Sequence, residues 1–321
     1  MPATTSVRGS SSRPSSSYST KDIAVRGGVL RVGEWVPEGG ATTVVVALHS
    51  LDGAHLAWSW LPAQLPEARI VAPDLRGRGQ SADLPGPYGI DEHVRDVLSV
   101  VDALQLSEVT LVGHSLGAFV ALGVAAARPG LVMQVVLVDG GLPLTVPLAL
   151  HPEDLIELVC GRPASRLDFA FASRASHRRF WQLHPAFAKD WSTQSDEYAD
   201  YLVDERVAPD ASIEFRPIAS IPAIEADSRE LSGTVGVRRR LLSAGCPTVL
   251  LTAARDLSNQ SPGIYSPREV ELSAAEVPEL RVLPVERVNH YTIVTSPRGA
   301  SAIAGEVRRG LRAREVRLEA S

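Results

Sequence analysis

Several features that would point to other functions are missing from this chain of 321 residues. It has only two cysteines, Cys160 and Cys246, which excludes a disulfide scaffold and favours a reducing, cytoplasmic location. It contains no HExxH or CxxC motif and no complete glycine-rich nucleotide loop, so we expect neither a metal nor an organic cofactor. No apolar run is long enough to span a bilayer.

Positive charge is also in short supply. There are 32 Lys and Arg against 37 Asp and Glu, and the formal net charge of −5 argues against a nucleic-acid partner. Hydrophobic residues make up 45% of the chain and charged residues 21%, as in globular proteins with a large core. The length suits one large α/β domain with an insertion, or two domains. We expect a small-molecule substrate as the partner, and the sequence is compatible with a homodimer.

The amino-terminal stretch, residues 1–20, is rich in serine and lacks the apolar centre of a signal peptide, so we expect a disordered tail. Residues 23–37 then predict a β-hairpin around Gly27-Gly28. Further on, apolar strand patterns alternate with helical ones, which predicts a mainly parallel sheet with helices on both faces. The expected strands are 43–48, 69–73, 109–113, 134–139, 247–252 and 280–285, with helices at 90–104, where Asp91 is the expected N-cap, and at 297–314.

The chain is organised around residues 109–127. An apolar, β-branched run predicts a buried strand, and an Ala-, Leu- and Val-rich run without proline predicts a buried helix. Between them lies Gly113-His114-Ser115-Leu116-Gly117, a G-x-S-x-G motif in the strand–turn–helix context that this motif requires. Glycine suits such a sharp turn because it has no Cβ to clash. The alternative is a glycine-rich turn with an incidental serine.

This unit resembles the nucleophile turn of the α/β-hydrolase superfamily, in particular its serine esterases and lipases. A second hallmark of that superfamily is the run Asp74-Leu-Arg-Gly-Arg-Gly-Gln-Ser81, whose arginines we expect to fix the loop through salt bridges. The resemblance implies a mostly parallel eight-stranded sheet flanked by helices. It divides the chain into a core, residues 21–141 and 241–321, and an inserted helical cap, residues 142–240.

The resemblance also implies a catalytic triad in the order nucleophile, acid, base. Ser115, Asp256 and His290 each follow a predicted strand, and the carboxyl ends of parallel strands meet at one edge of the sheet. A serine needs a base to take its proton, and a histidine needs a carboxylate to orient it. Asp139, at the end of the strand after the nucleophile, is the alternative acid. For His290 the alternative is a histidine on a surface loop.

An oxyanion hole is expected from two backbone N–H groups, those of Leu51 and Leu116. The superfamily usually has His-Gly before the first of these positions, whereas this chain has His49-Ser50 and so departs from the pattern in this loop. We expect His49 to brace this loop. The remaining histidines fit no catalytic position; His55 is expected at the surface or rim, and His93, His151, His177 and His184 are expected to face solvent.

The cap is expected to be mostly helical, with helices starting near Pro152, at 173–183 and at 186–205. It is rich in aromatic residues, which suggests a mainly apolar substrate pocket. The candidates for substrate contact are Trp58, Phe180, Trp181, Trp191 and Tyr291. The alternative for each is a structural role in a small core, such as the core of the cap.

Within the superfamily, Ser115 argues against epoxide hydrolases and haloalkane dehalogenases, which use aspartate at this position. Tyr291 after the base argues against carbon–carbon hydrolases, which often have tryptophan there. The expected reaction is hydrolysis of an ester, thioester or lactone through an acyl-enzyme. Two alternatives stay open: a tailoring enzyme of specialised metabolism (methylesterase, cyclase or lyase), and a ligand-binding protein with slow turnover on the same fold.

Overall fold

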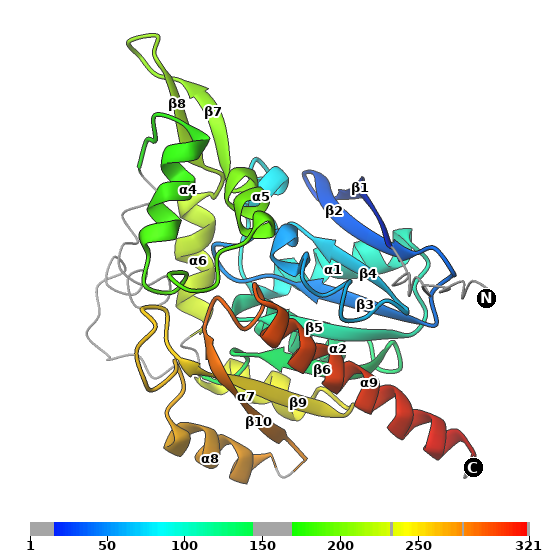
Figure 1. Ribbon diagram of the computed structural model, residues 1–321. Helices are drawn as coiled ribbons and strands as arrows, with labels where there is room; N and C mark the ends of the chain where they lie inside the picture. Colours follow the sequence, from blue (N-terminus) through cyan, green and yellow to red (C-terminus); the bar gives the residue numbers. More distant parts are fainter. Residues whose placement is uncertain (1–15, 144–168, 232–233, 278, 320–321) are drawn as a thin grey trace, which may run out of the picture.

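A computed structural model describes residues 16–143, 169–231, 234–277 and 279–319. Eight strands form one sheet in the order β1-β2-β4-β3-β5-β6-β9-β10 (Figure 1). The pairs β1–β2 and β2–β4 are antiparallel, and all other neighbours in the sheet are parallel, so the expected sheet is confirmed. The strands are β1 Ser16–Val25, β2 Gly28–Pro37, β3 Thr43–Leu48, β4 Ala68–Pro73, β5 Val109–His114, β6 Val132–Val138, β9 Thr248–Arg255 and β10 Arg281–Asn289.

Helices cover both faces of this sheet, because its central strands are apolar on both sides. Helices α1 and α2 pack on one face, with α7 beside α2, whereas α9 and the short 3-10 helix η1 pack on the other (Figure 1). None of the helices in the described ranges is long and apolar enough to cross a membrane. The bounds are η1 His55–Trp58, η2 Gly79–Ser81, α1 Ile90–Ala103, α2 Leu116–Ala127, α7 Thr234–Leu242, α8 Pro267–Glu276 and α9 Pro297–Glu319.

The amino-terminal hairpin is longer than the sequence predicted. Residues 16–20, which we expected in a disordered tail, are the first half of β1 and pair with β2. Tyr18 lies opposite Trp35, with ring centroids 5.1 Å apart, and such cross-strand aromatic pairs stabilise a ladder. Residues 1–15 lie outside the described residues. The predicted hairpin is confirmed, but its turn lies at residues 26–27, one residue before the predicted Gly27-Gly28, because Val25 pairs with Gly28.

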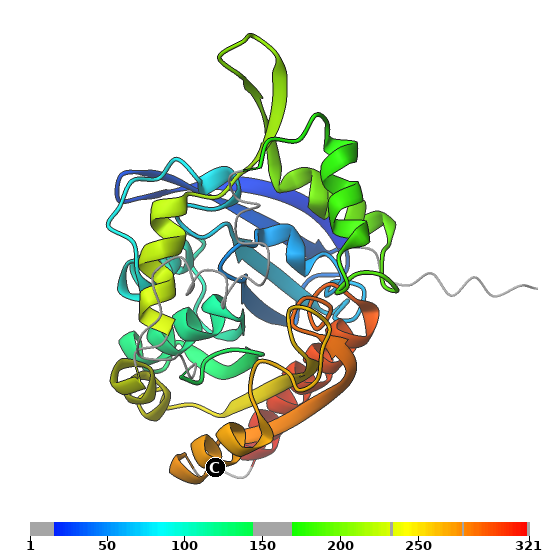
Figure 2. The same ribbon diagram turned by 90° about the vertical axis from the view of Figure 1, so that its left-hand side faces the viewer.

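The inserted segment between β6 and β9 contains helices and a β-hairpin. Its described elements are α4 Arg174–Leu183, α5 Thr193–Tyr201, β7 Val203–Val207, β8 Ile213–Pro217 and α6 Ile221–Leu231. The helix predicted from 173 is confirmed, and the helix predicted near Pro152 lies outside the described residues. The helix predicted at 186–205 is wrong at both ends: α5 begins only at Thr193, and after Tyr201 the chain enters β7, which pairs with β8 around a turn at 208–212 (Figures 1 and 2). This hairpin projects away from the sheet.

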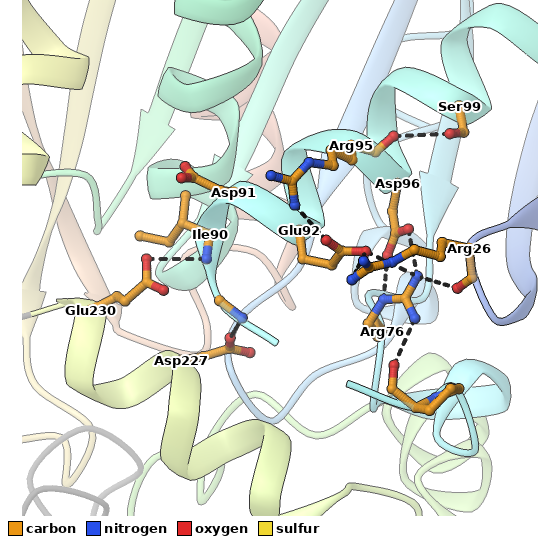
Figure 3. Close-up of polar contacts among 12 residues, drawn as sticks. Arg26, Arg76, Ile90, Asp91, Glu92, Arg95, Asp96, Ser99, Asp227 and Glu230 are labelled. Atoms are coloured by element: carbon orange, nitrogen blue, oxygen red, sulfur yellow. Dashed lines mark hydrogen bonds and ion pairs between the residues drawn. The ribbon is translucent and has the colours of Figure 1, made fainter. Parts of the chain in front are cut away.

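The amino terminus of α1 is capped from the inserted segment. The predicted N-cap Asp91 is wrong: the N-cap position is Gly89, which has φ +109 and no side chain to accept a bond. The N–H of Gly89 donates to Asp227 (2.7 Å) and that of Ile90 to Glu230 (3.2 Å), both on α6 (Figure 3). Carboxylates at this end also suit the helix dipole. These bonds attach α6 to the core.

Candidate active site

Ser115 lies at the turn between β5 and α2, as the G-x-S-x-G motif predicts. Its backbone has φ +52 and ψ −117, a conformation that residues with a side chain rarely adopt. Its N–H donates to the carbonyl of Val138 on β6, 3.0 Å away. The serine is therefore held on a strained turn, directly before the first residue of α2.

The backbone around this turn is too crowded for side chains. A Cβ on Gly117 would lie 2.2 Å from the carbonyl oxygen of Leu48, and one on Gly113 would lie 2.2 Å from that of Gly117. A Cβ on Gly140 would lie 2.5 Å from the carbonyl oxygen of Ser115 itself. We expected the first two glycines from the motif. Gly140 was missed, because it comes from a different strand end and no sequence motif marks it.

His290 and Asp139 form a buried pair. His290 follows β10, and its Nδ1 lies 2.7 Å from Oδ2 of Asp139, which follows β6. The other carboxylate oxygen accepts a bond from the N–H of Ala253 at 3.0 Å, so the acid is held at both oxygens. Asp139 is fully buried and His290 is nearly so. Because Nδ1 faces the acid, Nε2 is the ring nitrogen left for a proton from a nucleophile.

Asp256, the acid that the sequence favoured, binds elsewhere. Its Oδ1 accepts from the N–H groups of Ser258 (2.9 Å) and Gln260 (2.7 Å), so the carboxylate closes its own loop after β9. The described residues contain no hydrogen bond between Asp256 and His290, and the partner of His290 is the alternative acid, Asp139. Strands β6 and β9 are neighbours in the sheet, so both carboxylates follow strand ends at the same edge.

His114 ties the serine strand to the histidine loop. Its Nε2 donates to the carbonyl oxygen of His290 (2.8 Å), and the two ring centroids lie 4.6 Å apart. Burial, together with the charge of His290, holds the pKa of His114 well below its usual range, so the ring stays neutral and keeps a single proton to donate. The sequence did not reveal this contact, because His114 occupies the variable position of the motif.

The loop after β3 is braced by His49, as expected. The Nδ1 of this buried ring donates to the carbonyl of Ser50 (2.7 Å), and Nε2 accepts from the N–H of Leu75 (2.8 Å). Both bonds need the neutral ring, and burial lowers the pKa of His49 to about 4. The serine in place of the usual glycine is accommodated in this loop, with its hydroxyl 3.2 Å from Asp52.

The two predicted oxyanion donors come from neighbouring segments. Leu116 is the first residue of α2, where N–H groups have no carbonyl partner within the helix. Leu51 follows the His49 loop, and its carbonyl accepts from Nε of Arg78 at 2.8 Å. The N–H of Gly117 donates to the carbonyl of His49 (3.1 Å), which joins the start of α2 to this loop. Among the described residues, no backbone carbonyl accepts from the N–H of Leu51 or Leu116.

A largely apolar pocket lies between the loop after β3, the residue after His290, and α4 and α5. Of the predicted contact residues, Trp181, Trp191 and Tyr291 line it. Trp58 does not, because it is buried in the core beneath η1; Phe180 does not either, and it packs on Trp181 with ring centroids 5.7 Å apart. The full lining is Ser50, Asp52, Trp60, Trp181, Phe187, Trp191, Ser195, Tyr198, Ala199, Leu202, Tyr291 and Thr295.

A second buried histidine–carboxylate pair was not foreseen. His55, expected at the surface or rim, is fully buried; its Nδ1 lies 2.8 Å from Asp74 and its Nε2 lies 2.8 Å from the hydroxyl of Tyr18. Asp74 also accepts from the hydroxyl of Tyr201, at the end of α5 (2.5 Å). Burial alone would raise the pKa of Asp74, but the charge and hydrogen bond of His55 and the bond from Tyr201 leave it below its usual value.

A third pair lies between α1 and α6. His93 and His177, expected to face solvent, are buried, and Nε2 of His93 lies 2.8 Å from Asp227. His151 lies outside the described residues. The salt bridges expected of the two arginines in the 74–81 run are confirmed: Arg78 pairs with Asp227. Arg76 pairs with Asp96, as Figure 3 shows. Within the described ranges, no group of three or more His, Cys, Asp or Glu side chains is placed to hold a metal.

Comparison with known proteins agrees with the fold. The model of the alpha/beta hydrolase family matches residues 8–302. The chain belongs to this family. It is 38% identical to Lipase LipV of Mycobacterium tuberculosis over 110 residues, which is 34% of this chain and 41% of LipV. It is 35% identical to a carbendazim hydrolyzing esterase of Nocardioides sp. over 108 residues, 31% of this chain and 45% of that protein. The matched stretch thus spans less than half of either relative.

Among solved structures, that of E-2-(acetamidomethylene)succinate hydrolase has a fold similar to the fold of this chain. The TM-score is 0.71 at 20% identity, and the match covers 91% of this chain and 100% of that one. At this level of identity the likeness shows the fold alone.

Proposed function

We propose that this family member is a serine hydrolase that cleaves an ester, thioester or lactone of a small, largely apolar substrate. The observation that carries the proposal is the buried Asp139–His290 pair, which faces the same edge of the sheet as Ser115. The family match and the lipase and esterase relatives support a hydrolase.

In the proposed mechanism, Nε2 of His290 takes the proton of Ser115 while the hydroxyl oxygen attacks the carbonyl carbon. Asp139 orients the ring through Nδ1 and stabilises its charged form. The N–H groups of Leu51 and Leu116 donate to the oxyanion. His290 then protonates the leaving group. Water, activated by the same ring, attacks the acyl-enzyme and releases the carboxylic acid product from Ser115.

The pocket supports an apolar acyl or alcohol group as the part of the substrate that is recognised. Aromatic rings from α4, the segment after it and the His290 loop pack edge-to-face, for example Trp181 with Tyr291 at 5.8 Å between centroids. Such a surface binds flat or branched apolar groups chiefly by burial. We therefore expect aromatic and short branched esters to be better substrates than charged ones.

Labelling with a fluorophosphonate tests the mechanism directly. We expect one label per chain on the wild-type protein and none on Ser115→Ala. Ser99→Ala is a matched control, because the Ser99 hydroxyl donates to the backbone carbonyl of Arg95 within α1 and lies outside the site (Figure 3). No labelling of folded wild-type protein would overturn the proposal. Labelling without turnover of p-nitrophenyl esters would favour the slow-turnover binding protein instead.

A further inference from the structure

Arg78 is fully buried, and each of its contacts leads to a different part of the protein. Its Nε donates to the carbonyl of Leu51 (2.8 Å), in the loop that supplies the first proposed oxyanion donor. Its Nη1 donates to the carbonyl of Arg76 (2.9 Å) and pairs with Asp227 on α6 (2.5 Å). The planar guanidinium fixes these directions relative to one another.

The loop that carries Arg78, residues 74–81, lies between the inserted segment and the loop at Leu51, which supplies the first proposed oxyanion donor. On one side, the N–H of Leu75 donates to His49. On the other side, the N–H of Gly79 donates to the carbonyl of Ile218 (3.1 Å) and the N–H of Ser220 to the carbonyl of Gly77 (2.8 Å). Residues 218–220 lead directly into α6, so a shift of α6 would be transmitted to this loop.

Stability alone is a poor explanation for an arginine here. Its Nη2 is buried and finds no acceptor in the part of the chain that the structure describes, and a buried unpaired donor is costly. A buried ion pair with Asp227 is also weak evidence for net stabilisation. The bond to the Leu51 carbonyl, in contrast, fixes a peptide next to the one whose N–H is proposed to face the oxyanion.

We propose that Arg78 is a positioning residue for the hydrolysis proposed above. It holds the loop at Leu51 so that the N–H of this residue faces the oxyanion, and it makes that position depend on the contact of α6 with the core through Asp227. The inference depends on the proposed function, since it concerns the stabilisation of that reaction's oxyanion.

The variant Arg78→Lys tests this role while keeping the positive charge beside Asp227. A lysine has no rigid fork and does not reach both partners in the same geometry. Losing one oxyanion donor outright lowers kcat roughly 10²–10³-fold, so a displaced donor should lower it about tenfold to a hundredfold. We expect KM for a p-nitrophenyl ester to stay within about twofold. The rate of fluorophosphonate labelling and the affinity for a boronic acid inhibitor should fall by the same factor as kcat.

Arg76→Lys is the matched control. Arg76 lies in the same loop, is equally buried and pairs with Asp96, but it bonds to Pro85 and Arg26 rather than to the oxyanion loop (Figure 3). We expect this variant to lower the melting temperature while kcat per labelled site stays within about twofold of wild type. If both variants lose kcat equally, Arg78 has only a structural role and the inference is wrong.

Asp227→Asn tests the dependence on α6. It leaves Arg78 bonded to Leu51 but weakens the contact with α6, so we expect a smaller loss of kcat, about threefold to tenfold. In the double variant with Arg78→Lys the two losses should not multiply, because both act through one contact. Wild-type labelling with unchanged labelling of Arg78→Lys would overturn this inference alone. No wild-type labelling would overturn the proposed function instead.

Discussion

The buried pairs His290–Asp139 and His55–Asp74 have similar geometry at Nδ1 of the histidine. They differ in the group that lies next to the other ring nitrogen, Nε2. In both pairs Nδ1 faces a carboxylate: His290 with Asp139 at 2.7 Å, and His55 with Asp74 at 2.8 Å. The Nε2 of His55 is occupied by the hydroxyl of Tyr18, so both of its nitrogens are bound within the fold. In the proposed mechanism, the Nε2 of His290 receives the serine proton.

The two carboxylates, Asp74 and Asp139, occupy equivalent positions at the ends of their strands, so this position does not distinguish one pair from the other. Asp74 directly follows β4 and Asp139 directly follows β6, so both lie at the carboxyl ends of parallel strands. What differs is the surrounding structure: Asp74 accepts bonds from the η1 histidine and from Tyr201 of the inserted segment, whereas Asp139 bonds to the sheet and the His290 loop. Position at a strand end is therefore not enough to identify the acid of a triad, and the hydrogen-bond partners of the carboxylate must also be known.

The largest expected effect comes from removing the charge of the proposed acid. Asp139→Asn should lower kcat roughly 10⁴-fold, because an amide favours the wrong ring tautomer and does not stabilise the charged imidazole. Asp256→Asn is the matched control and should stay within about threefold of wild type. Steady-state kinetics on a p-nitrophenyl ester measures both. The reverse result would restore Asp256 as the acid and remove the contrast between the two pairs.

Breaking the second pair should affect stability rather than chemistry. His55→Leu leaves Asp74 buried without its histidine, and we expect the free energy of unfolding to fall by about 3 kcal/mol. Urea denaturation followed by tryptophan fluorescence gives this value. The kcat per fluorophosphonate-labelled site should change less than about threefold. A loss of kcat like that of Asp139→Asn would show that the second pair also takes part in catalysis.

A smaller effect is expected where the second pair meets the inserted segment. Tyr201→Phe removes the hydroxyl that donates to Asp74 and should lower the free energy of unfolding by about 1.5–2 kcal/mol, at the lower end of the range for a hydrogen bond to a charged group. Tyr88→Phe is a useful control, because its hydroxyl donates to the neutral carbonyl of Leu84. An equal loss in both variants would argue against a special contribution from Asp74.

The smallest effect should appear at alkaline pH. Burial, followed by the charge of Asp74, raises the pKa of Tyr18 to about 12, against about 10 for a free tyrosine. Because the folded pKa is raised, this contribution to stability is fully present below about pH 10 and is lost as the pH rises towards 12. Melting temperatures measured from pH 9 to 11.5 should fall less steeply for Tyr18→Phe than for wild type. Parallel curves would mean that Tyr18 titrates normally.

The sequence predicted the parts of this fold that depend on local patterns. The strand–turn–helix context located Ser115, and the positions of the strands along the chain and of the hairpin followed from apolar runs and glycine turns. The bracing role of His49 and the ion pairs of the two buried arginines also agree with the expectation.

The errors have both local and long-range causes. Asp139 and Asp256 follow neighbouring strands, and only the three-dimensional path of the β9–α8 loop directs Asp256 back onto its own backbone. His55 is buried because Tyr18, from a segment read as a tail, closes over it. The end of α5 was misplaced because the β7–β8 ladder overrides the local helical pattern.

The crowding around Ser115 restricts where new specificities can be introduced by engineering. Any side chain on Gly117 or Gly140 would displace the main chain at or beside Ser115, the proposed nucleophile, so we expect libraries that randomise these positions to consist mostly of inactive variants. Trp191 and Tyr198 lie on the opposite wall of the pocket, which the inserted segment provides. Saturation mutagenesis confined to that wall can exchange substrates without disturbing the serine.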